Sequence, residues 1–151
     1  MNFDKINSWA KINLSLNVIK RLPNSYHKIE SLITFSQIFD QIKIKKTNEN
    51  KNKIFFYGKF SRGIKNKNTI SKLLSLLEQK KIIIDQKFEI RIKKNIPQGA
   101  GLGGGSMNAA SVLKYFVKKK IINISNKKIK EIAFKVGSDV PLGLEKKNSI
   151  L

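Results

Sequence analysis

Glycine is concentrated in one part of this 151-residue chain, since five of its nine glycines lie in residues 99–105. An alternating apolar run at Phe88, Ile90 and Ile92 precedes this stretch, and apolar residues at helical spacing follow it from Ala109. The order strand, glycine loop, helix presents backbone N–H groups and the positive end of a helix dipole to an anion. A flexible linker would be expected to contain more serine and would not run into an amphipathic helix. The sequence therefore predicts a phosphate-binding loop.

Two common phosphate motifs fit this loop poorly. The P-loop pattern ends in Gly-Lys followed by Ser or Thr, and Gly105-Ser106-Met107 contains no lysine. The dinucleotide pattern G-x-G-x-x-G is matched by residues 99–104, but the acidic residue expected about 20 positions later is missing. Residues 118–120 are all lysine instead, which would suit a 2′-phosphate. A dinucleotide site therefore stays open as an alternative.

Composition excludes several classes of site. The chain has no cysteine, which rules out disulfides and thiolate-bound metals, and His27 is its only histidine. The net charge is +21, but the lysines are spread along the chain among many isoleucines and asparagines, three residue types with A/T-rich codons. The lysine runs at 118–120 and 127–128 lack interleaved aromatic residues, so we expect no nucleic-acid partner. No apolar stretch reaches the roughly 20 residues that cross a bilayer, and we expect a cytoplasmic protein without a membrane partner.

The remaining apolar pattern predicts an α+β fold. Residues 8–19 alternate apolar and polar side chains, as in a half-buried strand, which puts Lys11 and Asn13 on one face. Further strand-like segments lie at 29–39, 40–46, 54–57 and 88–92, and helical spacing is found at 69–81, 108–120 and 126–136. Thr69 is the expected N-terminal cap of the first helix. These elements predict a mixed sheet with helices on one face.

Three polar residues have both a structural and a functional interpretation. Asp139 is one of only ten acidic residues and lies past the last predicted helix, in the turn at 137–142 that contains Gly and Pro. An aspartate there is a catalytic candidate, although such residues more often form the turn itself. Lys11 is either a solvated side chain of its strand or part of a site. His27 is either a packed or surface imidazole or a hydrogen-bond partner for a ligand.

The glycine loop resembles the ATP loop of the GHMP kinase superfamily, which includes galactokinase, homoserine kinase, mevalonate kinase and phosphomevalonate kinase. The resemblance lies in residues 97–110. The triple glycine before Ser106, followed by Asn108-Ala-Ala, is similar in particular to the 4-diphosphocytidyl-2-C-methyl-D-erythritol kinase family. This resemblance implies a fold like ribosomal protein S5 domain 2, which forms the N-terminal domain of these kinases.

Other segments resemble motifs of the same family and occur in the same order. They are residues 10–14 (Ala-Lys-Ile-Asn-Leu), Tyr26-His27 with Glu30, and residues 137–141 (Gly-Ser-Asp-Val-Pro), the last with Ser138 where the family usually has alanine. The resemblance covers residues 9–142, which is nearly the whole chain. Four ordered motifs make it highly specific.

The resemblance implies a kinase that transfers the γ-phosphoryl group of ATP, with Mg²⁺, to the free 2-hydroxyl of 4-diphosphocytidyl-2-C-methyl-D-erythritol, in the non-mevalonate route to isoprenoid precursors. Asp139 would accept the hydroxyl proton, and Lys11 would stabilise both the ionised Asp139 and the charge on the transferred group. Asn13 would contact the substrate or Lys11, Tyr26 would stack on the cytosine ring, and His27 would hydrogen-bond to its edge. The ATP loop would consist of Pro97, Gln98, Gly99, Ala100, Gly101, Leu102, Gly103, Gly104, Gly105, Ser106 and Met107, with Ser106 near Mg²⁺ and no other protein ligand assigned to the metal.

The chain departs from the family's pattern at two places. Met107 stands where the family usually has a second serine, which removes one hydroxyl near the phosphates. Family members also continue well beyond position 151 into a second domain, and the apolar strand expected from 142–144 gives way to Glu145-Lys-Lys-Asn148. We therefore expect residues 1–151 to be the N-terminal ATP-binding domain of such a kinase, truncated and without its C-terminal domain, and inactive alone.

Two further interpretations of the sequence stay open. One is a different kinase of the superfamily, of the homoserine or mevalonate type. The presence of Tyr26-His27 and of the triple glycine favours instead the family whose substrate contains cytidine. The other is an inactive fragment or a basic S5-like domain that binds RNA or a protein. The strand order and the oligomeric state do not follow from the sequence.

Overall fold

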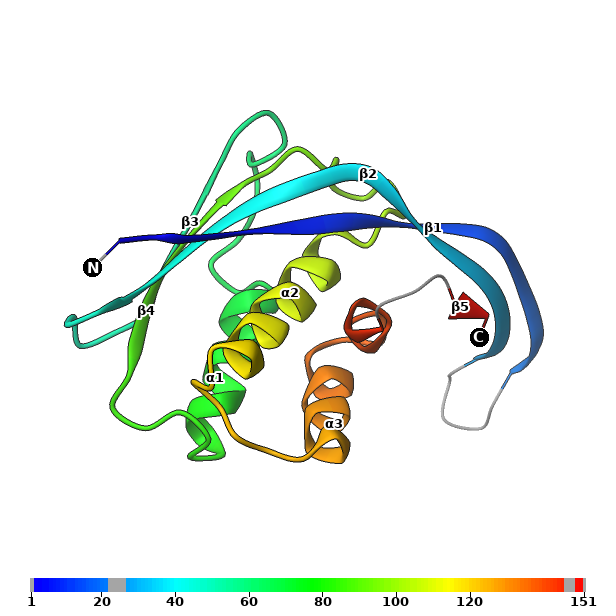
Figure 1. Cartoon of the computed structure of the whole chain (residues 1–151). Helices are drawn as coiled ribbons and strands as arrows, with labels where there is room; N and C mark the ends of the chain where they lie inside the picture. Colours follow the sequence, from blue (N-terminus) through cyan, green and yellow to red (C-terminus); the bar gives the residue numbers. More distant parts are fainter. Residues whose placement is uncertain (1, 22–26, 146–148, 151) are drawn as a thin grey trace.

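The computed structural model describes residues 2–21, 27–145 and 149–150 (Figure 1). A β-sheet forms one layer and three helices form the other, all on the same face of the sheet (Figure 1). The mixed α+β arrangement predicted from the sequence is confirmed. No helix in this part of the chain combines the length and the hydropathy that a membrane-crossing helix requires.

The sheet has the strand order β1-β2-β4-β3, and the short β5 pairs with β2. Its strands are β1 (Asp4–Arg21), β2 (His27–Thr47), β3 (Lys53–Tyr57), β4 (Lys87–Lys93) and β5 (Ser149–Ile150). β2 is antiparallel to β1, β4 and β5, whereas β3 is parallel to β4. Since β1 is an edge strand, backbone groups on its outer side are available to other parts of the chain.

The long hairpin of β1 and β2 is only partly covered by the helices. The segments predicted at 29–39 and 40–46 are one continuous strand, in which the side chains of Ile42 and Ile44 are buried against the helices. In contrast, every residue of β1 from Asn13 to Arg21 is exposed. Figure 1 shows this end of the hairpin extending past α2 and bending round beside β5.

The helices pack their apolar stripes against the sheet and against one another. They are α1 (Thr69–Gln79), α2 (Gly104–Lys118) and α3 (Asn126–Val136). In α1 the buried residues follow helical spacing, as predicted: Ile70, Leu73, Leu74 and Leu77. In the centre of the core, the ring of Phe116 from α2 lies 4.7 Å from that of Phe88 in β4.

The C-terminal part of α2 is bonded to the start of β1. The hydroxyl of Tyr115 donates to the Asp4 carboxylate at 2.7 Å, and Lys119 pairs with the same group at 3.0 Å. Burial and this hydrogen bond raise the pKa of Tyr115, whereas the Tyr115 and Lys119 hydrogen bonds hold the pKa of Asp4 below its ordinary value. These contacts join the end of α2 to the edge strand β1.

One predicted helix start and one predicted cap are wrong in detail, although α1 begins at Thr69 as predicted. α2 begins at Gly104 rather than at 108, because Gly103 adopts a left-handed conformation and its carbonyl accepts the Met107 N–H at 2.9 Å. The cap of α1 is Asn68 rather than Thr69, since the Asn68 side chain accepts from the N–H groups of Ile70 and Ser71, each at 3.0 Å. The helix predicted at 126–136 is confirmed with both ends.

The strand expected at residues 142–144 is also wrong. Pro141–Leu144 forms a short 3₁₀ helix, η1, whose N–H group at Gly143 bonds to the Val140 carbonyl at 3.1 Å. Proline favours such a turn because its ring fixes φ at a helical value. The chain therefore turns across α2 at this point before it reaches β5.

Candidate functional site

The glycine loop between β4 and α2 forms the floor of a cleft of about 500 Å³. Gly99, Gly101 and Gly103 have φ values of 70°, 71° and 63°, which other residues rarely adopt. A side chain at Gly99 or Gly101 would meet open space, so the left-handed backbone itself is what requires glycine at these two positions. The cleft is lined by all predicted loop residues from Pro97 to Ser106, and also by Phe56, Ile64, Asn68, Thr69, Ile70, Lys94, Asn108 and Asp139.

The N-terminus of α2 opens into this cleft. No side chain caps it, because the cap position is Gly103. The unpaired N–H groups of the first turn and the positive end of the helix dipole are therefore available to a ligand. Among the residues that the structure describes, Asp139 is the one acidic side chain in the wall of the cleft. This is the donor-rich environment that binds phosphate groups.

Lys11 of β1 and Asp139 of the turn after α3 form an ion pair in which Lys11 Nζ lies 3.1 Å from Asp139 Oδ2. The Lys11 side chain is 6% exposed and that of Asp139 is 41% exposed, so the cation is held rigidly while the carboxylate faces solvent. Lys11 Nζ also donates to Asn13 Oδ1 at 3.1 Å. The sequence put Lys11 and Asn13 on one face of a strand, and the fold brings Asp139 to them.

A backbone hydrogen bond joins the lysine to the glycine loop. The pairing of β1 with β2 is irregular between Trp9 and Lys11, and the Lys11 N–H donates to the Leu102 carbonyl at 3.0 Å. A side chain at Gly103 would lie 3.3 Å from Lys11 Cε. The lysine stem and the loop are therefore in close contact, which holds the ion pair at the edge of the cleft.

The turn that carries Asp139 is fixed from both sides. Lys72 Nζ of α1 donates to the last carbonyl of α3, that of Val136, at 2.9 Å. Val140, next to Asp139, is completely buried, and its N–H bonds to the Gly137 carbonyl at 3.1 Å. On the far side, a Cβ at Gly143 of η1 would lie 2.5 Å from Ala110 Cβ of α2, so that only glycine permits this approach.

Other predicted site residues lie in different surroundings. The Met107 side chain is 2% exposed and does not line the cleft, since it packs beneath η1, where its Sδ would be 3.1 Å from a Cβ at Gly143. A serine at position 107 would therefore not face the glycine cleft in this fold. Tyr26 lies outside the described residues. For His27 the structure gives only the backbone, which pairs with Arg21 at the start of β2.

Sequence reasoning missed several residues of the cleft. Asn68 and Thr69, at the start of α1, form part of its wall, and the Thr69 hydroxyl donates to the Gly105 carbonyl at 2.6 Å. Lys94 and Asn108 also line it, and both bond to Asp40 of β2, which is completely buried. The only signal in the sequence was an acid within an apolar run of a chain that has few acids.

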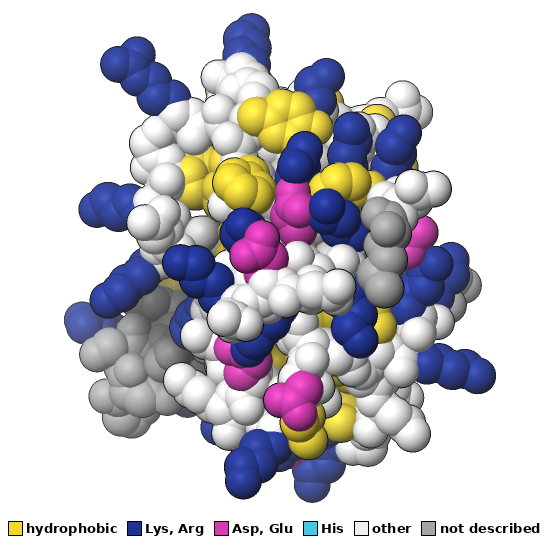
Figure 2. All heavy atoms as spheres, turned by 90° about the vertical axis from the view of Figure 1, so that its left-hand side faces the viewer, with side chains coloured by type: hydrophobic (Ala, Val, Ile, Leu, Met, Phe, Trp, Pro, Cys, Tyr) yellow, Lys and Arg dark blue, Asp and Glu magenta, His cyan; other side chains and the backbone are white. Residues whose placement is uncertain are grey.

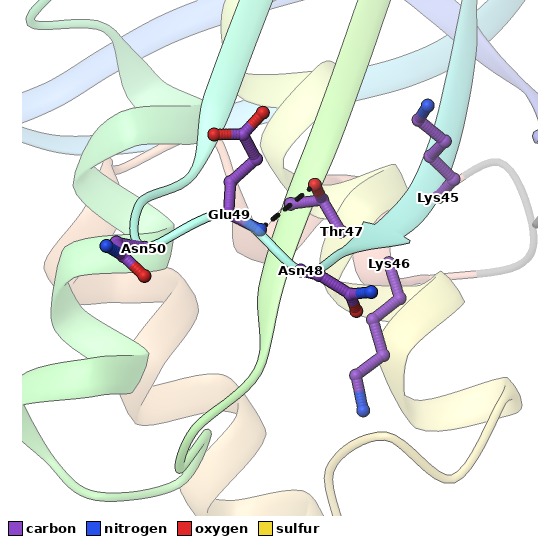
Figure 3. A pocket seen from close by; sticks show the side chains of 6 residues that line it. All are labelled: Lys45, Lys46, Thr47, Asn48, Glu49 and Asn50. Carbon is purple, nitrogen blue, oxygen red and sulfur yellow. Dashed lines mark hydrogen bonds between the residues drawn. The ribbon is translucent and has the colours of Figure 1, made fainter.

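Two other hollows lie elsewhere on the part of the surface that the structure describes. One contains none of the residues predicted for phosphate or proton transfer, and the other contains only Met107 of that set. The hollow with Met107 lies between β1, α2 and η1. The first is formed by six consecutive residues, 45–50, at the end of β2 and in the turn after it, and Lys45 and Lys46 point to opposite sides there (Figure 3). Thr47 Oγ1 accepts the Glu49 N–H there at 3.3 Å, which is the ordinary stabilisation of a turn.

Comparison with known proteins adds to this geometry. The family model of the GHMP kinases N-terminal domain matches residues 68–145, from the cap of α1 to the end of η1. The chain belongs to the GHMP kinases. The predicted family and its N-terminal domain fold are thereby confirmed, and a kinase loop is favoured over the dinucleotide alternative.

Relatives of this GHMP kinase chain carry the name 4-diphosphocytidyl-2-C-methyl-D-erythritol kinase. The protein of that name from Pelagibacter ubique is 50% identical over 151 residues, which is all of this chain and 53% of the relative. The one from Caldicellulosiruptor bescii is 36% identical over 140 residues, 93% of this chain and 48% of the relative. The chain spans about half the length of the curated relatives that it matches.

Solved structures agree with this assignment. A crystal structure of 4-(cytidine 5'-diphospho)-2C-methyl-D-erythritol kinase superposes with a TM-score of 0.71 at 27% identity, over 93% of this chain and 48% of that one. Homoserine kinase from Cytophaga hutchinsonii gives 0.64 at 17% identity, over 95% of this chain and 43% of that one, which shows a common fold alone. The predicted resemblance to the 4-diphosphocytidyl-2-C-methyl-D-erythritol kinases is confirmed.

Proposed function

We propose that this chain is the nucleotide-binding half of a kinase that phosphorylates the 2-hydroxyl of 4-diphosphocytidyl-2-C-methyl-D-erythritol with ATP. The observation that carries the proposal is the ion pair between Lys11 Nζ and Asp139 Oδ2, at 3.1 Å, on the edge of the glycine cleft. A phosphate-binding loop alone is compatible with many ligands. A carboxylate and a cation placed together beside it are what the transfer of a phosphoryl group to an alcohol requires.

The roles of the two side chains follow from their surroundings. An alcohol is a weak nucleophile near neutral pH, and the half-exposed Asp139 carboxylate is accessible to accept its proton. The buried Lys11 ammonium lies against the Asp139 carboxylate and offsets the negative charge that develops on the transferred group. Asn13 accepts a hydrogen bond from Lys11 Nζ and thereby orients it.

The glycine cleft fits the phosphate groups of ATP. Its floor is backbone with left-handed glycines, and the uncapped start of α2 faces the ligand. Ser106, in the wall of the cleft, is the hydroxyl that Mg²⁺ would find beside the phosphates. When bound, Mg²⁺ would neutralise part of the phosphate charge.

The substrate side of the site requires more chain than these residues. By resemblance, Tyr26 and His27 hold the cytosine, and we propose that a second domain, which the resemblance also implies, completes the cleft. The cytoplasm, where ATP is available, is the compartment that we expect. Because this chain matches about half of the Pelagibacter ubique relative, the other half of that relative can be supplied to it in a turnover assay.

The test is a turnover assay in which the chain is combined with the C-terminal half of the Pelagibacter ubique relative. We expect ATP-dependent phosphorylation of the cytidine substrate and none of homoserine or mevalonate. Asp139→Asn and Lys11→Met should each lower kcat by about 100-fold or more. Asp85→Asn is the matched control, because Asp85 is exposed on a loop outside the cleft. Full turnover by Asp139→Asn would refute the assigned mechanism, and turnover of homoserine would refute the assigned substrate.

A further inference from the structure

A single buried carboxylate is bonded to both ends of the glycine loop. Asp40, in the middle of β2, is completely buried and does not line the cleft. One of its oxygens accepts the backbone N–H groups of Asn95 and Ile96, at 2.7 and 2.9 Å. The other accepts from Lys94 Nζ and from Asn108 Nδ2, the latter at 3.0 Å. Asp40 therefore contacts the chain directly before the loop and again in α2, directly after it.

Lys94 lies beneath the start of α2. Its side chain is 4% exposed, and its Nζ would be only 3.2 Å from a Cβ at Gly104, the first residue of the helix. A charge buried to this extent is unfavourable unless an opposite charge compensates it, and Asp40 supplies that charge. The Asp40 carboxylate thus holds the Lys94 ammonium under the loop, where both groups are shielded from solvent.

Asn108 connects this pair to the cleft wall. It is 1% exposed, and the described residues offer no partner to its Oδ1 atom, although its Nδ2 bonds to Asp40. Burying an amide oxygen without a hydrogen bond costs desolvation free energy. The Asn108 side chain keeps its position in spite of this cost, because its Nδ2 is bonded to Asp40. Asp40 is thus the common partner of four hydrogen-bond donors that line or lead into the cleft.

We propose that Asp40 is a positioning residue of the nucleotide site, which fixes the two ends of the glycine loop relative to each other and so preorganises the loop for phosphate. This inference rests on the proposed function, since it takes the cleft to be the ATP site. Asp40 touches neither the nucleotide nor the acceptor alcohol. It acts through Lys94, Asn108 and the N–H groups of Asn95 and Ile96, in the way that supporting residues hold a binding group in its productive geometry.

The test avoids leaving a buried charge unpaired. Asp40→Ala alone would strand the Lys94 ammonium and could unfold the chain, so the test variant is Asp40→Ala combined with Lys94→Met, which removes both charges. The rescue variant is Asp40→Asn with Lys94→Met. Its amide oxygen still accepts from Asn95 and Ile96, and its amide nitrogen can donate to Asn108 Oδ1 once that side chain is flipped.

Two measurements are made on the whole chain: the Kd for Mg-ATP by calorimetry, and the exchange rates of the Asn95 and Ile96 amide protons. The Ala/Met variant is expected to bind Mg-ATP about tenfold more weakly or worse, by analogy with supporting residues at other sites, and to exchange these amides faster. The Asn/Met variant is expected to restore most of both. Leu77→Ala is the control, because Leu77 is buried in the last turn of α1, away from the cleft.

The outcomes separate this inference from the proposed function. Equal Kd values and equal exchange rates in the Ala/Met variant and the unsubstituted chain would overturn the positioning role. A loss of affinity equal to that of Leu77→Ala, without rescue in the Asn/Met variant, would also overturn it, because Asp40 would then act only on stability. If the unsubstituted chain bound no Mg-ATP, the proposed function would fail for this chain, and the exchange rates would still decide whether Asp40 fixes the loop.

Discussion

At the scale of single residues, the position of the Asp139 turn depends on one close approach. η1 crosses α2 where a Cβ at Gly143 would lie 2.5 Å from Ala110 Cβ and 3.1 Å from Met107 Sδ. The backbone at Gly143 has no positive φ, so space rather than conformation requires glycine there. Met107, which sequence comparison assigned to the phosphate loop, contributes to this packing instead.

We therefore predict that Gly143→Ala lowers the free energy of unfolding by about 1–3 kcal/mol, the usual cost of overpacking. Gly105→Ala is the matched control, because its new methyl group would meet Thr69 at an ordinary 3.5 Å in a helical backbone. It should be neutral or stabilise the fold by about 0.5–1 kcal/mol, since alanine is the better helix former. Urea unfolding of the two variants measures the difference, and equal stabilities would contradict the close approach.

At the scale of elements, the start of α1 combines a structural and a functional role. Asn68 caps the helix through a capping box with Ser71, and Thr69 donates to the loop carbonyl of Gly105. Both Asn68 and Thr69 also form part of the cleft wall. The cap of α3, Ser125, accepts the Lys128 N–H at 3.3 Å but lies outside the cleft.

Asn68→Ala and Ser125→Ala are each expected to lower the free energy of unfolding by roughly 0.5–2 kcal/mol, the range measured for lost N-terminal caps. Only Asn68→Ala should also weaken Mg-ATP binding, because fraying of α1 would disturb the wall of the cleft. Thermal unfolding and nucleotide titration of the same two samples separate the effects. Weaker binding in Ser125→Ala, to the same degree, would show that stability alone controls affinity.

At the scale of the whole molecule, the covered and uncovered parts of the β1–β2 hairpin differ sharply. Ile42 is completely buried under the helices, whereas Leu14, Leu16, Val18 and Ile19 are each more than half exposed. Positive side chains are spread over the surface: Figure 2 shows Lys and Arg groups distributed over one face of the molecule, with apolar groups between them. The Arg91 guanidinium lies 5.9 Å from the centre of the Phe55 ring.

Substitutions along the hairpin should report this difference directly. Leu16→Thr is expected to change the free energy of unfolding by less than about 0.5 kcal/mol, because an exposed β-branched residue suits a strand equally well. Ile42→Ala should cost about 2–5 kcal/mol by leaving a cavity in the core. Denaturant unfolding of both variants checks the pair. A large loss in Leu16→Thr would mean that this part of the hairpin is covered in solution.

Features that depend on neighbours in the chain were predictable from the sequence alone. The glycine loop was recognised because left-handed glycines and a following helix are local properties, and the stripe of α1 because its spacing is local. The motifs around Lys11 and Asp139 identified the family for the same reason. The errors were local as well: Pro141 and Gly143 formed a 3₁₀ turn where a strand was expected, and Asn68 capped α1 in place of Thr69.

Only the tertiary structure decided which distant residues meet. The family resemblance implied that Lys11 and Asp139 act together, but spacing along the chain does not bring them into contact, which required β1 to be the edge strand beside the glycine loop. Asp40 looked like an ordinary residue at the edge of a strand, yet burial made it the partner of Lys94 and Asn108. Burial makes an ionised group seek a partner, and which partner is within reach depends on how the layers pack. The sequence alone therefore determined the family and the phosphate loop, while packing determined the ion pair and the support beneath the loop.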